Sequence, residues 1–316
     1  MIVNVIKIDA GPATLVPLVH IPQLKDAPRK EGAYKVIKDS LGDLCHFYGD
    51  FSGFHIYMIA TTFKKRIVKD SLNYYDRENG LYYVELEITT NAGETKKVSI
   101  DNCKSPLIQA TSSGLTYPKD ITVVQFSPGT PDGLKFHFPD NQAKFKFSSN
   151  LIPDIPESIR HETPEFYDLN IEYIGKSVGK DGTREIADRL GNGHSKESLI
   201  LNEFVHKRTN LDAYAVLYKP GALTRGENGP IHDEMSYSEL VDVLEKSLIS
   251  SFLPEKNEQS RNFPNDLSVP AKQLINMGIN NIHLTVKSPI NYGLLYTGNV
   301  EKEKTHYFDL KVPNYR

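Results

Sequence analysis

The chain lacks the features that define several classes of protein. Only two of its 316 residues are cysteines, Cys45 and Cys103, too few for a disulfide framework or a four-cysteine zinc site, which fits a reducing compartment. No apolar run approaches the roughly 18–20 residues that a membrane-spanning helix needs. The first residues have no basic start and no small-residue cleavage site, so we expect no signal peptide. These absences predict a cytoplasmic protein that does not bind a membrane.

Several catalytic motifs are missing as well. The ten histidines form no H-x-x-x-H or H-E-x-x-H pair for zinc. No G-x-S-x-G segment is present for a serine hydrolase. Gly175-Lys176-Ser177 resembles the end of a phosphate-binding P-loop, but Asn170 stands where that loop requires its first glycine. The sequence therefore favours none of these three chemistries.

Positive charge is not in excess, because the formal net charge is −3. Non-specific binding of nucleic acid needs concentrated positive charge, so a nucleic-acid enzyme must gather that charge locally. Two clusters could do so, Lys64-Lys65-Arg66 and His206-Lys207-Arg208. Each could equally be an ordinary solvated charge run.

The first 150 residues predict a mostly antiparallel β domain. Aromatic and β-branched residues gather in short runs that alternate apolar with polar positions, as half-buried strands do. Turn-forming stretches separate these runs. The expected strands are 54–63, 80–88, 95–100, 121–126, 134–138 and 143–149. One helix is expected near 31–42.

The pattern changes after a proline-containing linker at 150–166. The segments beyond it predict an α+β fold, so we divide the chain into a β-rich domain (1–150), a second domain (151–262) and a β extension (263–316). The expected strands are 170–175, 213–218, 281–288, 292–298 and 306–312, and the expected helices are 183–190, 197–206 and 237–252.

The helix at 237–252 carries a glutamate in an unusual position. Ser236 and Glu239 have the spacing of a capping box, which predicts where the helix begins. Glu245 falls between Val241 and Ile249 in an apolar row. Burial of an unpaired carboxylate is costly, so we expect Glu245 to have a partner: a basic side chain, a hydrogen-bond network or a metal ion. Alternatively, Glu245 lies at the border of the apolar face and reaches water.

Three motifs follow one another in the second domain. The first is the strand Tyr173-Ile174-Gly175-Lys176-Ser177, and the second is a helix with Arg189, followed by His194. The third is the helix with Glu245, followed past a proline by Asn257. In this order and spacing the motifs resemble the GIY-YIG nuclease family. The resemblance implies a small antiparallel sheet flanked by helices.

The resemblance covers residues 170–257 and leaves one family motif unplaced. The family carries a Gly-Ile-Tyr strand about ten residues before Tyr-Ile-Gly, and 158–168 contains no such tripeptide. The segment 143–149 is a candidate for this strand without its tyrosine. The Gly-Leu-Tyr-Tyr at 80–83 is similar to the tripeptide but lies far upstream, and we expect it to be an ordinary strand.

The resemblance implies a metal-dependent endonuclease that uses Mg²⁺ or Mn²⁺. Glu245 would be the metal ligand, since hard divalent cations prefer oxygen and a single carboxylate can suffice. Arg189 would hold the scissile phosphate with two hydrogen bonds, and Arg184 is a rival for that role. Lys207 and Arg208 would contact the substrate.

The resemblance also implies that a tyrosine activates the attacking water. Tyr173 is the leading candidate, because Lys176 is near enough in sequence to lower its pKa and could also contact the substrate. Tyr167 is the alternative tyrosine. His194 would orient this group or contact phosphate, and Asn257 would shape the site through hydrogen bonds.

The expected activity is hydrolysis of phosphodiester bonds, in DNA more than in RNA. The N-terminal β domain would then recognise the target, and restriction or defence against phage is a suitable setting. The alternative is a module that keeps the fold, binds nucleic acid or protein and has lost cleavage. The unplaced Gly-Ile-Tyr strand favours this alternative, whereas Arg189, Glu245 and Asn257 favour the enzyme.

Overall fold

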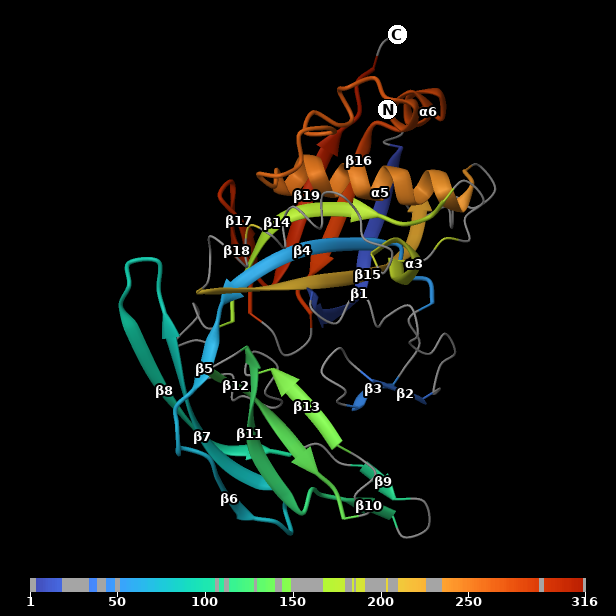
Figure 1. Ribbon diagram of the computed structural model, residues 1–316. Helices are drawn as coiled ribbons and strands as arrows, with labels where there is room; N and C mark the ends of the chain where they lie inside the picture. Colours follow the sequence, from blue (N-terminus) through green and yellow to red (C-terminus); the bar gives the residue numbers. More distant parts are fainter. Residues whose placement is uncertain are drawn as a thin grey trace.

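The structure is a computed structural model in which strands dominate over helices (Figure 1). It describes residues 4–18, 34–38, 44–48, 52–105, 108–110, 114–127, 130–139, 144–148, 167–179, 184, 186–190, 203, 210–225, 235–289 and 293–314. The coarse prediction of a mixed fold rich in strands is confirmed.

The largest element is an eight-stranded sheet in the order β18-β17-β14-β4-β15-β1-β16-β19. Most neighbours are antiparallel, but β1 pairs with β16 and β14 with β17 in parallel. The strands are β1 (Val5–Pro17), β4 (Ile56–Phe63), β14 (Leu169–Lys176), β15 (Leu211–Arg225), β16 (Asn281–Lys287), β17 (Leu295–Thr297), β18 (Val300–Glu303) and β19 (Thr305–Lys311).

This sheet corrects the division at residues 150 and 262. Strands β1 and β4 precede the first boundary, β14 and β15 lie between the two, and β16 to β19 follow the second. All three expected segments therefore contribute hydrogen-bonded neighbours to one sheet. The linear sequence does not reveal this mixing, because strand pairing across long separations leaves no local pattern.

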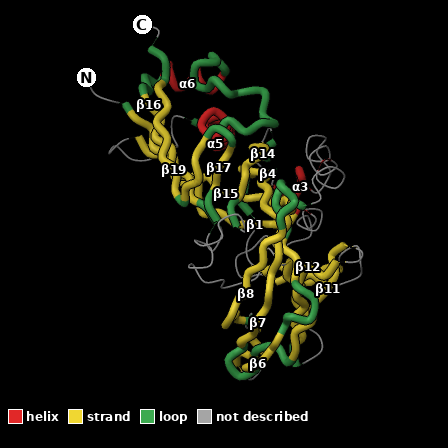
Figure 2. The backbone as a smooth tube through the Cα atoms, turned by 90° about the vertical axis from the view of Figure 1, so that its left-hand side faces the viewer, coloured by secondary structure: helices red, strands yellow, loops and turns green. Residues whose placement is uncertain are grey.

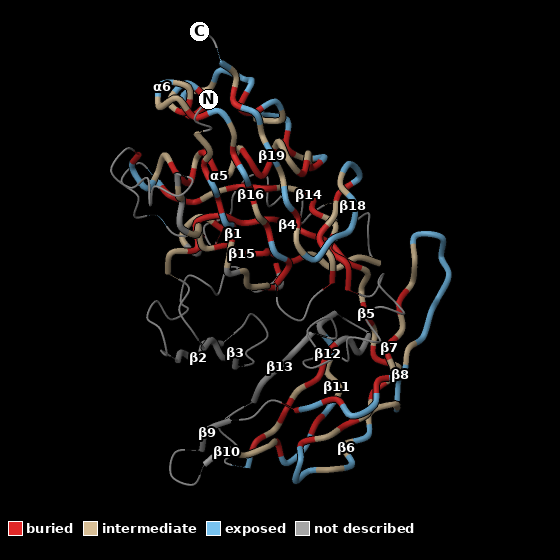
Figure 3. Tube along the Cα trace, turned by 180° about the vertical axis from the view of Figure 1, so that it is seen from behind, coloured by how far each residue is buried: buried red, intermediate tan, exposed pale blue. Residues whose placement is uncertain are grey.

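A second strand-rich part lies at the end of the molecule away from the termini (Figure 2). Strand β7 pairs with β5, β6 and β8, and β12 pairs with β11 and β13, all antiparallel as expected. Buried and part-buried positions alternate along β7 (Figure 3), which confirms a half-buried strand. The strands are β5 (Lys65–Ile67), β6 (Asn73–Asp76), β7 (Leu81–Thr89), β8 (Thr95–Lys104), β9 (Ile108–Ala110), β10 (Gly114–Thr116), β11 (Asp120–Ser127), β12 (Thr130–His137) and β13 (Lys144–Ser148).

The helix expected near 31–42 is wrong. Residues of that range form β2 (Tyr34–Lys38), which pairs antiparallel with β3 (Leu44–Tyr48). Its sequence Tyr-Lys-Val-Ile-Lys is rich in the aromatic and β-branched residues that strands favour. The helix expected at 197–206 lies outside the described residues, apart from Glu203.

The described helices are α3 (Ile186–Leu190), α5 (Tyr237–Phe252) and α6 (Val269–Asn276). The predicted start of α5 is confirmed, because the Ser236 hydroxyl accepts from the Glu239 backbone N–H and the Glu239 carboxylate accepts from that of Ser236. The helix ends at Leu253, whose φ of 49° is left-handed.

The two faces of β4 bury different clusters. Ile56, Met58 and Ala60 belong to the cluster that α5 covers. Tyr57 and Ile59 belong to another cluster, which α3 covers with Ile186 and Leu190. Helices α5 and α3 thus pack against opposite faces of the sheet near the paired strands β4 and β14.

Candidate functional site

Strands β4 and β14 bring two tyrosines together. The strands pair antiparallel, with Tyr57 opposite Gly175 and Ile59 opposite Tyr173. The ring centroids of Tyr57 and Tyr173 lie 6.0 Å apart. A Cβ added to Gly175 would lie 2.6 Å from the Tyr57 hydroxyl and 2.9 Å from the Tyr173 ring. Glycine is therefore needed here because both rings pass over its Cα.

Tyr57 is the functional candidate that sequence reasoning missed. It ends the tripeptide His55-Ile56-Tyr57, whose last two residues match those of Gly-Ile-Tyr. Segment 143–149, expected to supply the partner strand, contains β13, which pairs with β12 instead. The available signal was Ile-Tyr within a clear strand. Residues 64–168 separate the two strands, whereas the family motif has about ten residues between them.

His55 holds the start of β4 against the end of β14. Its Nδ1–H donates to the Ser177 carbonyl at 2.8 Å, and the Ser177 N–H donates to the His55 carbonyl at 2.8 Å. The ring also contacts Tyr237 edge-on, at 5.3 Å between centroids. His55 thus aligns Tyr57 with Gly175.

Glu245 lies in an ion-pair cluster on the α5 side of the sheet. Its Oε2 is 3.1 Å from the Lys176 ammonium, which also pairs with Asp242 one turn earlier on α5. The Glu245 side chain is 17% exposed. The prediction that Glu245 needs a partner is confirmed, and Lys176 is that partner.

The pKa values of this cluster follow from burial and charge. Burial raises the pKa of Glu245, and the nearby Lys176 and Arg189 only partly oppose that rise. Burial by itself would lower the pKa of Lys176, but Glu245 and Asp242 together raise it above the ordinary lysine value. Burial thus accounts for the raised pKa of Glu245, and the two carboxylates account for the raised pKa of Lys176.

Tyr173 does not have the lowered pKa that we expected. Burial and the negative charge of Glu245 raise its pKa, while Arg189 and a hydrogen bond with Tyr57 act in the opposite direction. The Lys176 ammonium, which we expected to lower this pKa, instead pairs with Asp242 and Glu245. In the protein without bound metal, the Tyr173 hydroxyl stays protonated at neutral pH.

Arg189 reaches the site from α3. Its charge acts on both Tyr173 and Glu245, whereas neither of these groups responds to Arg184. Arg184 is exposed, and its backbone N–H donates to the Val178 carbonyl at 3.0 Å. The geometry therefore favours Arg189 over Arg184 as the arginine of the site.

Asn257 fixes the strand that carries Tyr173. Its Oδ1 accepts from the Ile174 N–H at 2.8 Å, and its Nδ2 donates to the Ile174 carbonyl at 2.9 Å. The neighbouring Lys256 N–H donates to the Glu172 carbonyl at 3.2 Å. The turn after α5 thus satisfies backbone groups on the edge of β14, as a further strand would.

Other expected residues do not join the cluster. Tyr167 is buried in the core of the second strand-rich part, and its ring centroid is 4.9 Å from the Lys65 ammonium. Lys65 is 1% exposed, and burial lowers its pKa to about 7, so Lys64-Lys65-Arg66 is not a uniformly solvated patch. His194, Lys207 and Arg208 lie outside the described residues.

The donor set fits a hard divalent cation with few protein ligands. Glu245 and Asp242 supply carboxylates one turn apart, and Mg²⁺ commonly keeps several waters beside one or two carboxylates. Within the described ranges, no group of three His, Cys, Asp or Glu side chains is arranged to hold one metal ion.

Comparisons add no relative to this description. Among the described helices, none is both long and apolar enough to cross a membrane. Family models, curated proteins and solved structures give no significant match to the chain.

Proposed function

We propose that this chain is a metal-dependent endonuclease of the GIY-YIG type, which hydrolyses phosphodiester bonds in nucleic acid, in DNA more than in RNA. The observation that carries the proposal is the packing of Tyr57 against Tyr173 on paired strands, with Arg189 of α3 and Glu245 of α5 near enough for their charges to act on the pKa of Tyr173.

The order of these elements along the chain supports the proposal. An Ile-Tyr strand comes first, then the Tyr-Ile-Gly strand, the arginine helix, the glutamate helix and the asparagine. The first two strands are paired, as two half-motifs of one site require. The chain departs from the family in the long segment between them and in His55 at the glycine position.

Each residue has a role in this mechanism. Arg189 binds the phosphate and offsets the negative charge that develops on its oxygens. A Mg²⁺ or Mn²⁺ ion held by Glu245 would supply Lewis-acid stabilisation of that charge and of the leaving oxygen. Tyr57 or Tyr173 accepts the proton of the attacking water as a phenolate, after its own hydroxyl proton has passed to solvent. The charge of Arg189 favours that ionisation of Tyr173. Lys176 orients Glu245, and Asn257 keeps the Tyr173 strand in place.

A second candidate function is a binding module without cleavage. The observation that favours it is the ion pair of Lys176 with both Asp242 and Glu245. This ammonium competes with a cation for the same carboxylates, and the raised pKa of Tyr173 weakens it as a base. In either case the strand-rich part from β5 to β13 would recognise the target, and restriction or anti-phage defence is a suitable setting.

Nicking of supercoiled plasmid separates the two functions. The wild type should nick DNA in the presence of Mg²⁺ or Mn²⁺, and a chelator that removes the metal should stop the nicking. Glu245→Gln and Arg189→Ala should each lose at least about 100-fold in rate, on the scale of other electrostatic catalytic groups. Glu258→Gln and Lys272→Ala, at exposed positions outside the cluster and outside the strand-rich part from β5 to β13, are the matched controls.

Two outcomes would decide against the enzyme. A folded wild type that cleaves neither DNA nor RNA with either metal would leave the binding module as the better account. Cleavage that survives in both cluster variants would show that another site is responsible.

A further inference from the structure

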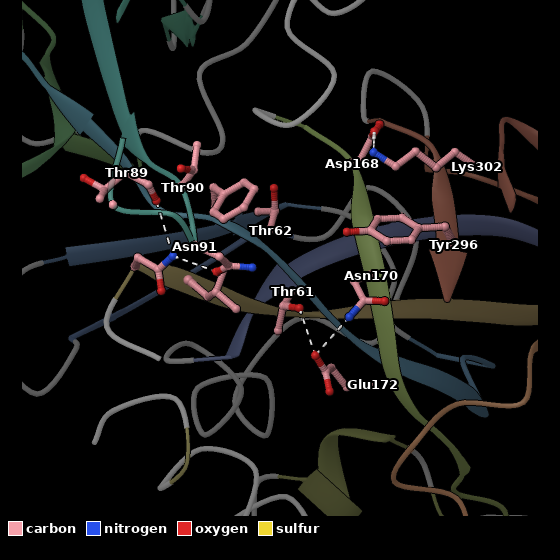
Figure 4. Close-up of a pocket in the computed structure, with 14 residues that line it drawn as sticks. Thr61, Thr62, Thr89, Thr90, Asn91, Asp168, Asn170, Glu172, Tyr296 and Lys302 are labelled. Carbon is pink, nitrogen blue, oxygen red and sulfur yellow. Dashed lines mark hydrogen bonds and ion pairs between the residues drawn. The ribbon is translucent and has the colours of Figure 1, made fainter. Parts of the chain in front are cut away.

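A polar cavity of about 690 Å³ lies where the large sheet meets the turn between β7 and β8. Figure 4 shows side chains from the ends of β4 and β14 facing those of the β7–β8 turn and of β17. Drug-sized ligands bind in pockets of roughly 300–1,000 Å³. The cavity is therefore large enough for one nucleoside.

A buried carboxylate stands in the wall of this cavity. Glu172 is 2% exposed, and its Oε1 accepts from the Thr61 hydroxyl at 3.2 Å and from the Asn170 amide at 3.1 Å. The pairing of β4 and β14 shifts register between Ile171 and Tyr173. This bulge places Glu172 on the face that also carries Tyr173.

Most of the remaining side chains that line the cavity are polar, and their charges balance. Asp168 and Lys302 pair with each other at 2.8 Å, while Asn91, Asn170 and Asn210 offer uncharged amides. The Glu172 carboxylate would repel an anionic group such as phosphate, because the lining has no surplus of positive charge to offset that repulsion. A neutral ligand with several N–H donors suits this wall better.

Tyr296 provides a flat apolar surface beside these groups. Its ring lies between Lys302 and Asn170 in Figure 4, and the Lys302 ammonium is 4.8 Å from the ring centroid. Stacking of a base on an aromatic ring contributes about 1–3 kcal/mol. A planar ligand with N–H donors along one edge can use both Tyr296 and Glu172.

We propose that this cavity binds a single unstacked nucleobase, guanine in preference to the other bases. Guanine presents adjacent N1–H and N2–H donors, which one carboxylate can accept together. Cytosine and adenine offer an amino group without a second N–H beside it, and thymine offers one N–H. Glu172 thus selects guanine by exchanging the hydrogen bonds that its Oε1 accepts from Thr61 and Asn170 for those from the base. The neighbouring amides bond the remaining polar atoms of guanine, and Tyr296 stacks on its ring.

The cavity and the catalytic cluster lie along the same strands. Thr61 is four residues from Tyr57 on β4, which corresponds to about 13 Å in a strand. A nucleic acid with its phosphate at Arg189 can therefore place a nearby base in the cavity, provided that the base leaves its stack. This identification of the ligand rests on the proposed function, and it makes the cavity the specificity site of the nuclease.

Titration with guanosine, adenosine, cytidine and thymidine tests the proposal, with saturation-transfer NMR and calorimetry as readouts. Guanosine should bind at millimolar concentrations or below, and at least tenfold more tightly than each of the others. Glu172→Gln should abolish this preference, and Tyr296→Leu should weaken all four nucleosides. Glu301→Gln, an exposed change on β18, is the matched control.

The full-length Glu245→Gln variant distinguishes this proposal from the proposed function. It should bind guanosine as well as the wild type does, even though it should not cleave. If no plasmid is nicked but guanosine still binds selectively, the base site stands without the nuclease. If plasmid is nicked but guanosine binds no better than thymidine, or binds equally to folded Glu172→Gln and Tyr296→Leu variants, the base site is overturned.

Discussion

Tyr57 lies directly opposite Gly175 across the antiparallel pair β4–β14, and its hydroxyl occupies the space that a Cβ at Gly175 would need. A single glycine therefore lets two tyrosine rings approach each other at the candidate site. This relationship links the sequence motif to the geometry of the site and leads to the first prediction.

Gly175→Ala should destabilise the protein by about 1–3 kcal/mol, the usual cost of overpacking a well-filled core. The Cβ would lie 2.6 Å from the ring and hydroxyl of Tyr57, which is fully buried and has little room to move. Urea unfolding measures the effect. Gly298→Ala is the control, since its Cβ would have no neighbour within 4 Å. Equal stabilities of the two variants would contradict the described packing.

Asn257→Leu should destabilise the protein by about 2–4 kcal/mol, because each buried backbone group left without a partner costs roughly 1–3 kcal/mol. The variant removes both hydrogen bonds to Ile174, which is fully buried. Asn257→Asp keeps the acceptor for the Ile174 N–H but buries a carboxylate against the Ile174 carbonyl, so it should destabilise the protein as well. Thermal and urea unfolding compare these variants with Asn262→Leu at an exposed position. If Asn262→Leu lowered the stability of the protein as much as Asn257→Leu does, the hydrogen bonds of Asn257 to β14 would not explain the effect.

The stability difference between wild type and Glu245→Gln should depend on pH. Because burial raises the folded-state pKa of Glu245 above 4.5, the folded state holds this proton more tightly than the unfolded state. Its stabilising contribution is complete below pH 4.5 and is lost as pH rises through the folded-state pKa. Wild type should therefore lose stability relative to Glu245→Gln over this window, as urea unfolding at several pH values would show. A wild type that instead gains stability relative to Glu245→Gln as pH rises would contradict this prediction.

The cleavage rate with Mg²⁺ should fall on the acid side with a midpoint above the ordinary glutamate pKa of 4.5. Protonated Glu245 cannot bind a cation, and metal binding competes with the proton. A higher Mg²⁺ concentration should therefore move the midpoint to lower pH. Initial rates at fixed ionic strength measure both effects. A midpoint insensitive to Mg²⁺ would mean that another group controls the acid limb.

Local patterns in the sequence predicted α5 well. Its capping box, its apolar rows and the need of Glu245 for a partner can all be inferred from neighbouring residues, and the structure confirms them. The resemblance to the GIY-YIG family singled out Arg189, whose charge acts on Tyr173, and Asn257, which binds the neighbouring Ile174.

Long-range pairing could not be predicted in the same way. The partner of β14 is β4, and residues 64–168 separate the two strands. Nothing in that segment marks the return of the chain to the same sheet, so Tyr57 was missed. The bulge at Glu172 and the pairing of Lys176 with Asp242 also arise only from the assembled strands and helix.

Comparison of the wild type with Tyr57→Phe tests the central claim most directly. A general-base or proton-transfer role is worth about 100- to 10,000-fold, so Tyr57→Phe should nick plasmid at least about 100-fold more slowly in Mg²⁺ while it remains folded. Tyr307→Phe, at an exposed position of β19, should cleave like the wild type. Equal cleavage by wild type and Tyr57→Phe would contradict the assignment of β4 and β14 to one catalytic site.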